Sequence, residues 1–235
     1  RARPTGPAGL AVAEDGLRLE ADPPPAAGAA ADWSFRIAGP RGETITDFEV
    51  EHERRMHLIV VRRDLTGYRH LHPRLGADGR WHVRLRLDEP GVHRAFADFR
   101  SGGRARTLGT DLAVPGDFRP RRLPAPAPVA SDGDHRAELS AENARGGATA
   151  ELTYRLTRRG RPLDGVEPYL GADGHLVALR EGDLAFLHVH PEESREPGVI
   201  RFGAELPSAG RYRLFLQYRH GGAVRTVAHT LEAAR

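Results

Sequence analysis

An internal repeat limits the possible folds of this chain more than any other feature of its sequence. The segment MHLIVVRRDLTGYRHLHP (56–73) aligns without a gap with GHLVALREGDLAFLHVHP (174–191). The alignment superimposes three pairs of histidines, each 118 positions apart: His57 and His175, His70 and His188, and His72 and His190. A repeat of this kind indicates two homologous units with the same elements in the same order.

The repeat continues on both sides of this motif. WSFRI (33–37) matches LTYRL (152–156), and GVHRAFADFR (91–100) matches GRYRLFLQYR (210–219), each after a shift of one residue in a loop. Each copy has about a hundred residues, which is a usual size for a domain. The sequence therefore predicts two homologous domains in tandem.

A proline-rich stretch, VPGDFRPRRLPAPAPVASDGD (114–134), separates the two copies. Proline disrupts helices and the central strands of sheets, so this stretch predicts a stiff, extended linker. We place the first domain at 1–116, the linker at 117–133 and the second domain at 134–235.

Both copies consist of short segments with the alternation of β-strands, and 27 glycines and 18 prolines break the chain between them. Expected strands in the first copy lie at 16–21, 33–37, 44–50, 57–61, 68–72, 81–87, 93–99 and 105–114. Those in the second copy lie at 135–141, 150–156, 175–179, 184–190, 199–206, 212–218 and 224–231. The sequence thus predicts an all-β protein of two tandem homologous antiparallel β-sandwich domains, immunoglobulin-like or cupredoxin-like.

The composition excludes several classes of site and partner. Cysteine is absent, so the chain cannot form disulfides, thiolate zinc sites, iron–sulfur clusters or a blue-copper centre. All 35 basic residues are arginines, the formal net charge is only +3, and the arginine doublets alternate with acidic residues. A nucleic-acid-binding protein would instead carry a clustered basic face, so we expect no nucleic-acid partner. No apolar run reaches the length of a membrane helix.

Each copy carries one histidine that opens an expected strand, then twelve residues, then His-x-His-Pro. Residues two apart in a strand point to the same face, and a return strand brings its side chains beside those of the first. Three neutral imidazoles form an adequate ligand set for a divalent transition metal. The predicted metal ligands are His57, His70, His72, His175, His188 and His190. The alternative is that these histidines are structural and hydrogen-bond backbone carbonyls.

Two residues outside the triads are candidate additional ligands, namely Asp98 and His93. The histidines that lie outside the triads are by default expected at the surface: His52, His82, His93, His135, His220 and His229. Known catalytic motifs are absent from the sequence, and no general base can be identified beside a histidine triad. We therefore expect that the chain is not an enzyme, although a three-histidine site with an open position could activate water.

The two aligned segments, extended in the second copy to PYLGADGHLVALREGDLAFLHVHP (168–191), resemble parts of secreted or membrane-anchored bacterial proteins with His-x-His-Pro motifs in tandem domains. Those proteins are described as heavy-metal- or copper-associated, with cupredoxin-like or immunoglobulin-like domains. The resemblance covers about a third of the chain and implies an extracytoplasmic protein that handles a transition metal. The chain departs from true cupredoxins because it has no cysteine.

These observations lead to one function and one alternative. We expect an exported protein, secreted, periplasmic or anchored at the cell surface, that begins at RARPTGPAGL after removal of a signal segment. It would bind copper, or next zinc, through one histidine triad per domain, for metal sequestration or delivery, because nitrogen-rich sites bind Cu²⁺ most tightly among first-row divalent ions. Its partners would be the metal ion and a membrane or exported protein. The alternative is a metal-free interaction or scaffolding module that binds a protein or a glycan.

Overall fold

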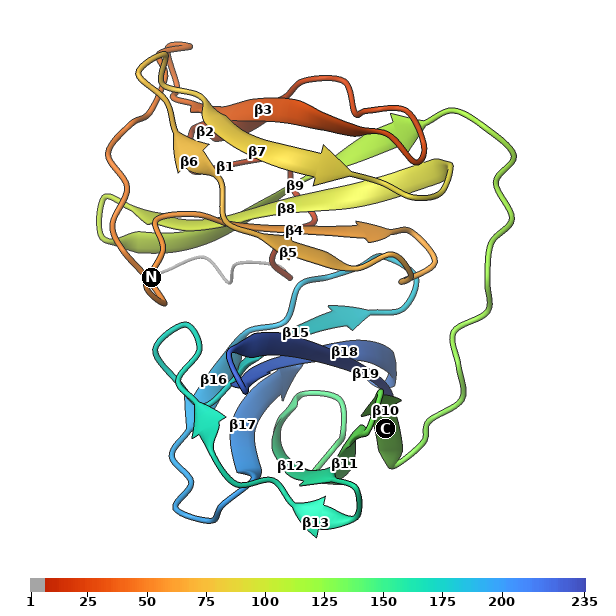
Figure 1. Ribbon diagram of the computed structural model, residues 1–235. Coiled ribbons are helices and arrows are strands. Elements are labelled where there is room, and N and C mark those ends of the chain that lie inside the picture. The colour runs from red at the N-terminus through yellow and green to blue at the C-terminus, as the bar shows by residue number, and fades with distance from the viewer. Residues whose placement is uncertain (1–6) are drawn as a thin grey trace. The chain divides into compact units, whose positions relative to one another are not determined.

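All regular elements in residues 7–235, the part of the chain that the computed structural model describes, are β-strands. The described part therefore contains no helix that could cross a membrane. The chain divides into two compact units: the first ends at Arg122 and also includes Gly182–Leu184, and the second comprises Leu123–Glu181 and Ala185–Arg235. Each unit is built from two packed sheets (Figure 1).

The first unit contains nine strands in two sheets. They are β1 (Ala13–Glu14), β2 (Leu17–Ala21), β3 (Ala30–Ala38), β4 (His57–Arg62), β5 (Arg69–Leu71), β6 (Arg74–Leu75), β7 (Trp81–Arg86), β8 (Gly91–Ser101) and β9 (Arg104–Val114). One sheet has the order β1-β2-β3-β7-β6 and the other β5-β4-β8-β9. All of their pairings are antiparallel.

The second unit contains the remaining ten strands. They are β10 (Val129–Asp132), β11 (His135–Glu142), β12 (Ala148–Arg158), β13 (Arg161–Pro162), β14 (Val166–Glu167), β15 (His175–Arg180), β16 (Val189–Glu192), β17 (Val199–Leu206), β18 (Gly210–His220) and β19 (Ala223–Ala233). One sheet has the order β10-β11-β12-β17-β16, with β13 on β12; the other has β14-β18-β15, with β19 on β18. The predicted fold class, tandem antiparallel β-sandwich domains, is confirmed.

Alternating side chains of these strands form a separate hydrophobic core in each unit. In β3, Trp33, Phe35 and Ile37 point into the first core. In β12, Leu152 and Tyr154 point into the second core in the same way. Strands whose side chains alternate in this way bury one face and leave the other available for polar or functional residues.

Three predicted elements differ from the structure: the strand at 44–50, the linker, and the strand at 184–190, of which only Val189 and His190 lie in a strand, β16. The segment 44–50 is irregular and makes only isolated bridges, Ala38 to Thr44 and Glu49 to Arg100. The segment resembled a strand because it includes the apolar Phe48. The Phe48 side chain packs into the core, edge-on to the rings of Trp81 and Phe99, at 5.0 and 5.4 Å between centroids.

The linker predicted at 117–133 is shorter in the structure. Strand β10, which follows the last proline of the stretch, pairs with β11 and so belongs to the second sandwich. Only residues 115–128 lack regular structure between β9 and β10.

Candidate metal centre

Three histidine rings of the first domain converge where strand β4 begins. His57 is the first residue of β4, and the antiparallel strand β5 places His70 opposite Ile59. His72 follows β5 directly. The ring centroids lie 5.2 Å apart for His57 and His70, 5.2 Å for His57 and His72, and 4.7 Å for His70 and His72. The structure thus brings all three residues of the first predicted triad together.

The hydrogen bonds of His57 leave its Nδ1 lone pair facing the cluster. His57 Nε2 lies 3.1 Å from the carbonyl oxygen of Glu51, which can only accept, so Nε2 carries the proton. His57 Nδ1 is then the basic nitrogen, and it lies 3.0 Å from His70 Nε2. A metal-binding histidine usually donates its second N–H to a carbonyl or carboxylate in this manner.

A tight turn presents the carbonyl group that holds His57. The amide of Glu51 donates to the Arg54 carbonyl at 2.8 Å, and the amide of Arg54 donates back to the Glu51 carbonyl at 3.0 Å. The two central residues, His52 and Glu53, have φ values of 48° and 63°. Such a turn holds two residues in the left-handed region, where side chains other than glycine are disfavoured, so the local conformation is unusual.

The third ring, His72, has a buried nitrogen with no protein partner. Within residues 7–235, His72 Nε2 makes no hydrogen bond although it is inaccessible to solvent. A buried polar atom without a partner costs free energy, and most such atoms in native proteins are satisfied. Among the three rings, His72 is therefore the one whose buried nitrogen the described protein residues leave unsatisfied.

Burial keeps two of the rings in the neutral form that binds metal ions. It lowers the pKa of His72 to about 4, with a further contribution from the nearby His57 and Arg54. Burial also lowers the pKa of His57, against the hydrogen bond to the Glu51 carbonyl, which raises it. Neutral imidazoles keep a lone pair for a metal ion at pH 7.

The two candidate additional ligands of the first domain lie in different places. Asp98 stands directly opposite His57 on the neighbouring strand β8, and its Oδ1 accepts a hydrogen bond from Thr107 Oγ1 at 2.8 Å. His93 pairs with Arg62 at the other end of β4, five residues along the strand, or about 17 Å. The structure therefore places Asp98 beside the cluster and does not bring His93 to it.

The second copy places its histidines differently. Leu71 of the first copy pairs with β4, but the equivalent residue, Val189, pairs with Ala204 of β17 in the other sheet. β15 ends at Arg180, and the chain then returns beside it as far as Leu187, whose amide donates to the Ala178 carbonyl at 2.9 Å. His-x-His of the second copy thus begins at the crossing from one sheet to the other.

In this arrangement His188 and His190 face each other, with ring centroids 4.1 Å apart, and both are exposed. His175 opens β15 opposite Gln217, the residue equivalent to Asp98. Gln217 donates to Thr226 Oγ1 at 3.2 Å. The second triad of His175, His188 and His190 remains a prediction.

A family model describes both copies. It matches residues 11–116 and again residues 129–235, and it is described as Domain of unknown function (DUF8832). The chain belongs to this family. The double match agrees with the tandem domains predicted from the repeat, and it carries no statement about metal. No curated protein matches the chain.

Solved structures resemble the chain only loosely. They include invasin, described as a bacterial integrin-binding protein (13% identity, TM-score 0.26, 91% of this chain and 38% of that one). A mutant of Salmonella alpha-2-macroglobulin gives 14% identity, a TM-score of 0.33 and coverage of 98% and 15%. The ectodomain of mouse nectin-like molecule 4 gives 13% identity and a TM-score of 0.23, with coverage of 93% of this chain and 64% of that one. The chain spans well under half the length of the first two, and similarity this low carries no argument about function.

The sequence did not reveal one residue close to the cluster, and it misplaced others. The His52 ring lies 6.1 Å from the His57 ring, in the tight turn, where no strand periodicity marks it. Three histidines expected at the surface are buried instead, namely His93, His135 and His229. Two of these belong to the second domain and contact other polar groups there. Side-chain burial of this kind depends on strand pairing that residue spacing alone does not specify.

Proposed function

We propose that the chain binds a divalent transition-metal ion through His57, His70 and His72. The observation that carries this proposal is the convergence of the three rings, with His57 Nδ1 3.0 Å from His70 Nε2 and the buried Nε2 of His72 unpartnered within residues 7–235. Three nitrogen ligands leave coordination positions open for water, for Asp98 or for a ligand from another molecule.

Cu²⁺ is the preferred ion of this proposal and Zn²⁺ the next. Nitrogen ligands bind Cu²⁺ most tightly among the first-row divalent ions, and Zn²⁺ also accepts three imidazoles. Trafficking of Cu⁺ would use several soft sulfur ligands, whereas this chain has one methionine and no cysteine. The role we infer is metal sequestration or delivery outside the cytoplasm, with His175, His188 and His190 as a second site in the other copy.

Metal titration of the metal-stripped chain tests the proposal. The wild type is expected to bind Cu²⁺ with submicromolar affinity, and His70→Ala/His72→Ala is expected to lose one equivalent of metal. An ion at 100 times its Kd stabilises the folded state by about 2.7 kcal/mol, so metal should raise the melting temperature of the wild type. The rise should be smaller in the variant. Calorimetric titration and thermal melts measure both effects.

A matched control separates loss of the site from general damage. His82 is an exposed histidine that pairs with Asp78 at 3.0 Å, so His82→Ala removes an imidazole without touching the cluster. This control should bind metal like the wild type. Equal metal binding by the wild type and by His70→Ala/His72→Ala would contradict the proposal.

The second candidate function is the metal-free module that binds a protein or a glycan. An exposed apolar side chain favours it: Val50, in the irregular segment before β4, is 63% exposed. Single exposed apolar residues are common, so this observation is weaker than the convergence of three rings. Absence of metal binding in the titration, together with lower metal-free stability of His70→Ala/His72→Ala, would favour this second candidate.

A further inference from the structure

A second histidine cluster lies in the second domain, apart from the predicted triads. His135 is the first residue of β11 and His220 is the last residue of β18, and these strands belong to opposite sheets of the sandwich. Each lies beside a tight hairpin: Asp132 pairs with His135 across one, and His220 pairs with Ala223 across the other. The contact between the two histidines therefore joins the sheets at one end of the sandwich.

Two ring nitrogens of this cluster face each other. His135 Nε2 lies 3.1 Å from His220 Nδ1, and the ring centroids are 5.1 Å apart. These values are close to those between His57 and His70. His135 is fully buried, whereas His220 is partly exposed, so the pair can be reached from solvent on the His220 side.

A carboxylate sets the protonation of the buried ring. Asp134 Oδ1 lies 2.9 Å from His135 Nδ1, close in distance although poorly aligned for a hydrogen bond. Its negative charge favours a proton on Nδ1, which leaves the Nε2 lone pair directed at His220. Carboxylates behind metal-binding histidines commonly have this orienting role.

Arginines prevent Asp134 from acting as a ligand itself. The Nε atoms of Arg158 and Arg159 lie 2.9 and 3.0 Å from Asp134 Oδ2. Asp134 is therefore a positioning residue for His135.

A buried hydroxyl next to the pair also has no partner. Tyr218 precedes His220 by two positions on β18, so both side chains lie on the same face of the strand. The Tyr218 ring lies 6.4 Å from the His135 ring, and its hydroxyl is buried without a hydrogen-bond partner in the described part of the chain. A metal-bound water would offer this hydroxyl a partner.

The first copy lacks both halves of the pair. Strand pairing places Leu17, at the start of β2, at the position of His135, because Leu19 pairs with Ile37 as Ala137 pairs with Leu156. The alignment places Ser101, at the end of β8, at the position of His220. The second copy thus differs from the first at two positions far apart in sequence that contact each other in space. A shared function for the two imidazoles accounts for both differences.

We propose that His135 and His220 form a two-imidazole site for a divalent transition-metal ion, with Asp134 orienting His135. Two nitrogen ligands suit Cu²⁺ or Ni²⁺, which accept further water ligands in a tetragonal arrangement. The site uses none of the residues of the first-domain triad, so it stands or falls independently of it.

Paramagnetic broadening in the full chain, labelled with ¹⁵N, tests this site residue by residue. Adding Cu²⁺ stepwise to the wild type, up to three equivalents, should broaden the amide signals of the hairpins at Gly133 and Gly221 in addition to those around His57. His220→Ala should abolish the broadening at the hairpins and leave the broadening around His57 unchanged. Asp134→Asn should weaken Cu²⁺ binding at the hairpins about 10-fold. His82→Ala should behave like the wild type.

The outcomes separate the two metal sites. Broadening near His57 alone would overturn this inference and leave the first-domain proposal standing, and broadening at the hairpins alone would do the reverse. If His220→Ala does not fold, His220→Gln keeps a hydrogen-bonding side chain and still removes the imidazole. Hairpin signals that are unaffected by Cu²⁺ in the wild type would identify the pair as a structural hydrogen bond between sheets.

Discussion

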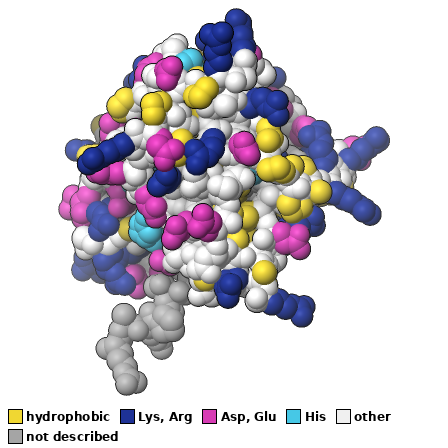
Figure 2. Space-filling view, turned by 90° about the horizontal axis from the view of Figure 1, so that it is seen from below, with side chains coloured by type: hydrophobic (Ala, Val, Ile, Leu, Met, Phe, Trp, Pro, Cys, Tyr) yellow, Lys and Arg dark blue, Asp and Glu magenta, His cyan; other side chains and the backbone are white. Residues whose placement is uncertain are grey.

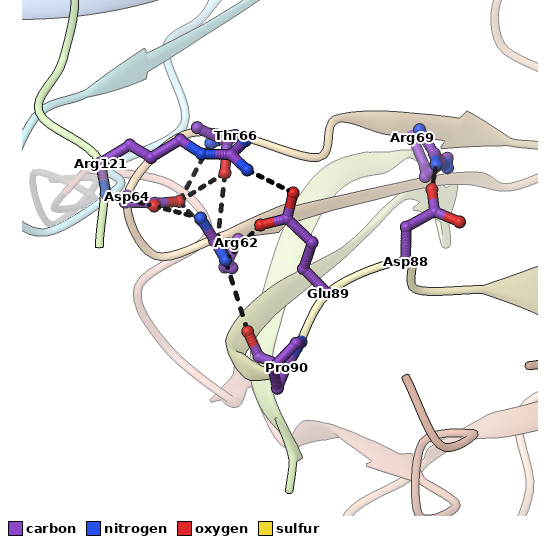
Figure 3. Close-up of polar contacts among 8 residues, drawn as sticks. All are labelled: Arg62, Asp64, Thr66, Arg69, Asp88, Glu89, Pro90 and Arg121. Carbon is purple, nitrogen blue, oxygen red and sulfur yellow. Dashed lines mark hydrogen bonds and ion pairs between the residues drawn. The ribbon is translucent and has the colours of Figure 1, made fainter. Parts of the chain in front are cut away.

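Replacing Asp64 with alanine is expected to lower the free energy of unfolding of the first domain by about 3 kcal/mol. Asp64 accepts hydrogen bonds from Arg62 Nε at 2.9 Å and from Arg62 Nη2 at 2.6 Å (Figure 3). The two side chains are only 5% and 3% exposed. Removing the carboxylate leaves a buried guanidinium with one acidic partner, Glu89, at 2.6 Å. A buried charge that loses its partner destabilises a fold far more than an exposed one does.

Tryptophan fluorescence during urea unfolding measures this effect in one domain. Both tryptophans of the chain, Trp33 and Trp81, lie in the core of the first domain. The matched control is Asp32→Ala, which removes an exposed ion pair with Arg84, where the side chains are 85% and 67% exposed. It should leave the unfolding midpoint unchanged. Equal midpoints for Asp64→Ala and the wild type would contradict the prediction.

The same contacts predict how this stabilisation depends on pH. Burial raises the pKa of Asp64, but hydrogen bonds from Arg62, the Arg121 amide and Thr66 outweigh it and bring the pKa to about 2. The contribution of Asp64 is therefore fully present above its unfolded pKa of about 3.9 and is lost as the pH falls toward 2. The stability difference between the wild type and Asp64→Ala should be constant from pH 7 to pH 5 and smaller at pH 3.

This network also includes residues of the predicted linker, which contact the first domain instead of standing free of it. The amide of Arg121 donates to Asp64 Oδ2 at 2.9 Å, and its side chain pairs with Glu89 at 2.6 Å. The Phe118 ring lies 5.2 Å from the Arg62 guanidinium. The proline content correctly indicates irregular structure here, but the contacts that hold this segment to the first domain join residues more than 25 positions apart. Spacing along the chain carries no signal for them.

The alternation of charges along the sequence, in contrast, correctly predicted the mixed distribution of charges on the surface. The sequence distributes arginine and acidic residues without a basic stripe, and on the face in Figure 2 the two kinds of side chain are interspersed. Strand alternation likewise predicted strands at 33–37 and 150–156, which lie in β3 and β12, because a strand with one buried face repeats every two residues. These features are local, so a single segment is enough to reveal them.

The sequence pattern could not predict which sheet each strand joins. Leu71 and Val189 occupy equivalent positions in the two copies, yet they pair with strands of different sheets. The same alternation fits either partner, and only the folded chain selects one. For the same reason the contact of His135 with His220, which lie 85 positions apart, could not be read from residue spacing.

Replacing Tyr154 is expected to have opposite effects depending on the substitute. Tyr154 is fully buried in the second core, edge-on to the rings of Phe202 at 6.2 Å and His229 at 5.5 Å between centroids. Tyr154→Ala removes the whole ring and should lower the free energy of unfolding of the second domain by about 4 kcal/mol. Tyr154→Phe keeps the ring and should raise that free energy by about 1 kcal/mol.

The hydroxyl group is the reason for the expected gain. Across residues 7–235 it has no hydrogen-bond partner, and burial raises the pKa of Tyr154, so the group remains a neutral, unsatisfied donor. The first copy already carries a phenylalanine at the equivalent position, Phe35, which is buried in the first core. It serves as the natural comparison for Tyr154→Phe. Since the second domain has no tryptophan, unfolding is followed by far-ultraviolet circular dichroism. A Tyr154→Phe variant less stable than the wild type would mean that the hydroxyl is satisfied by buried water.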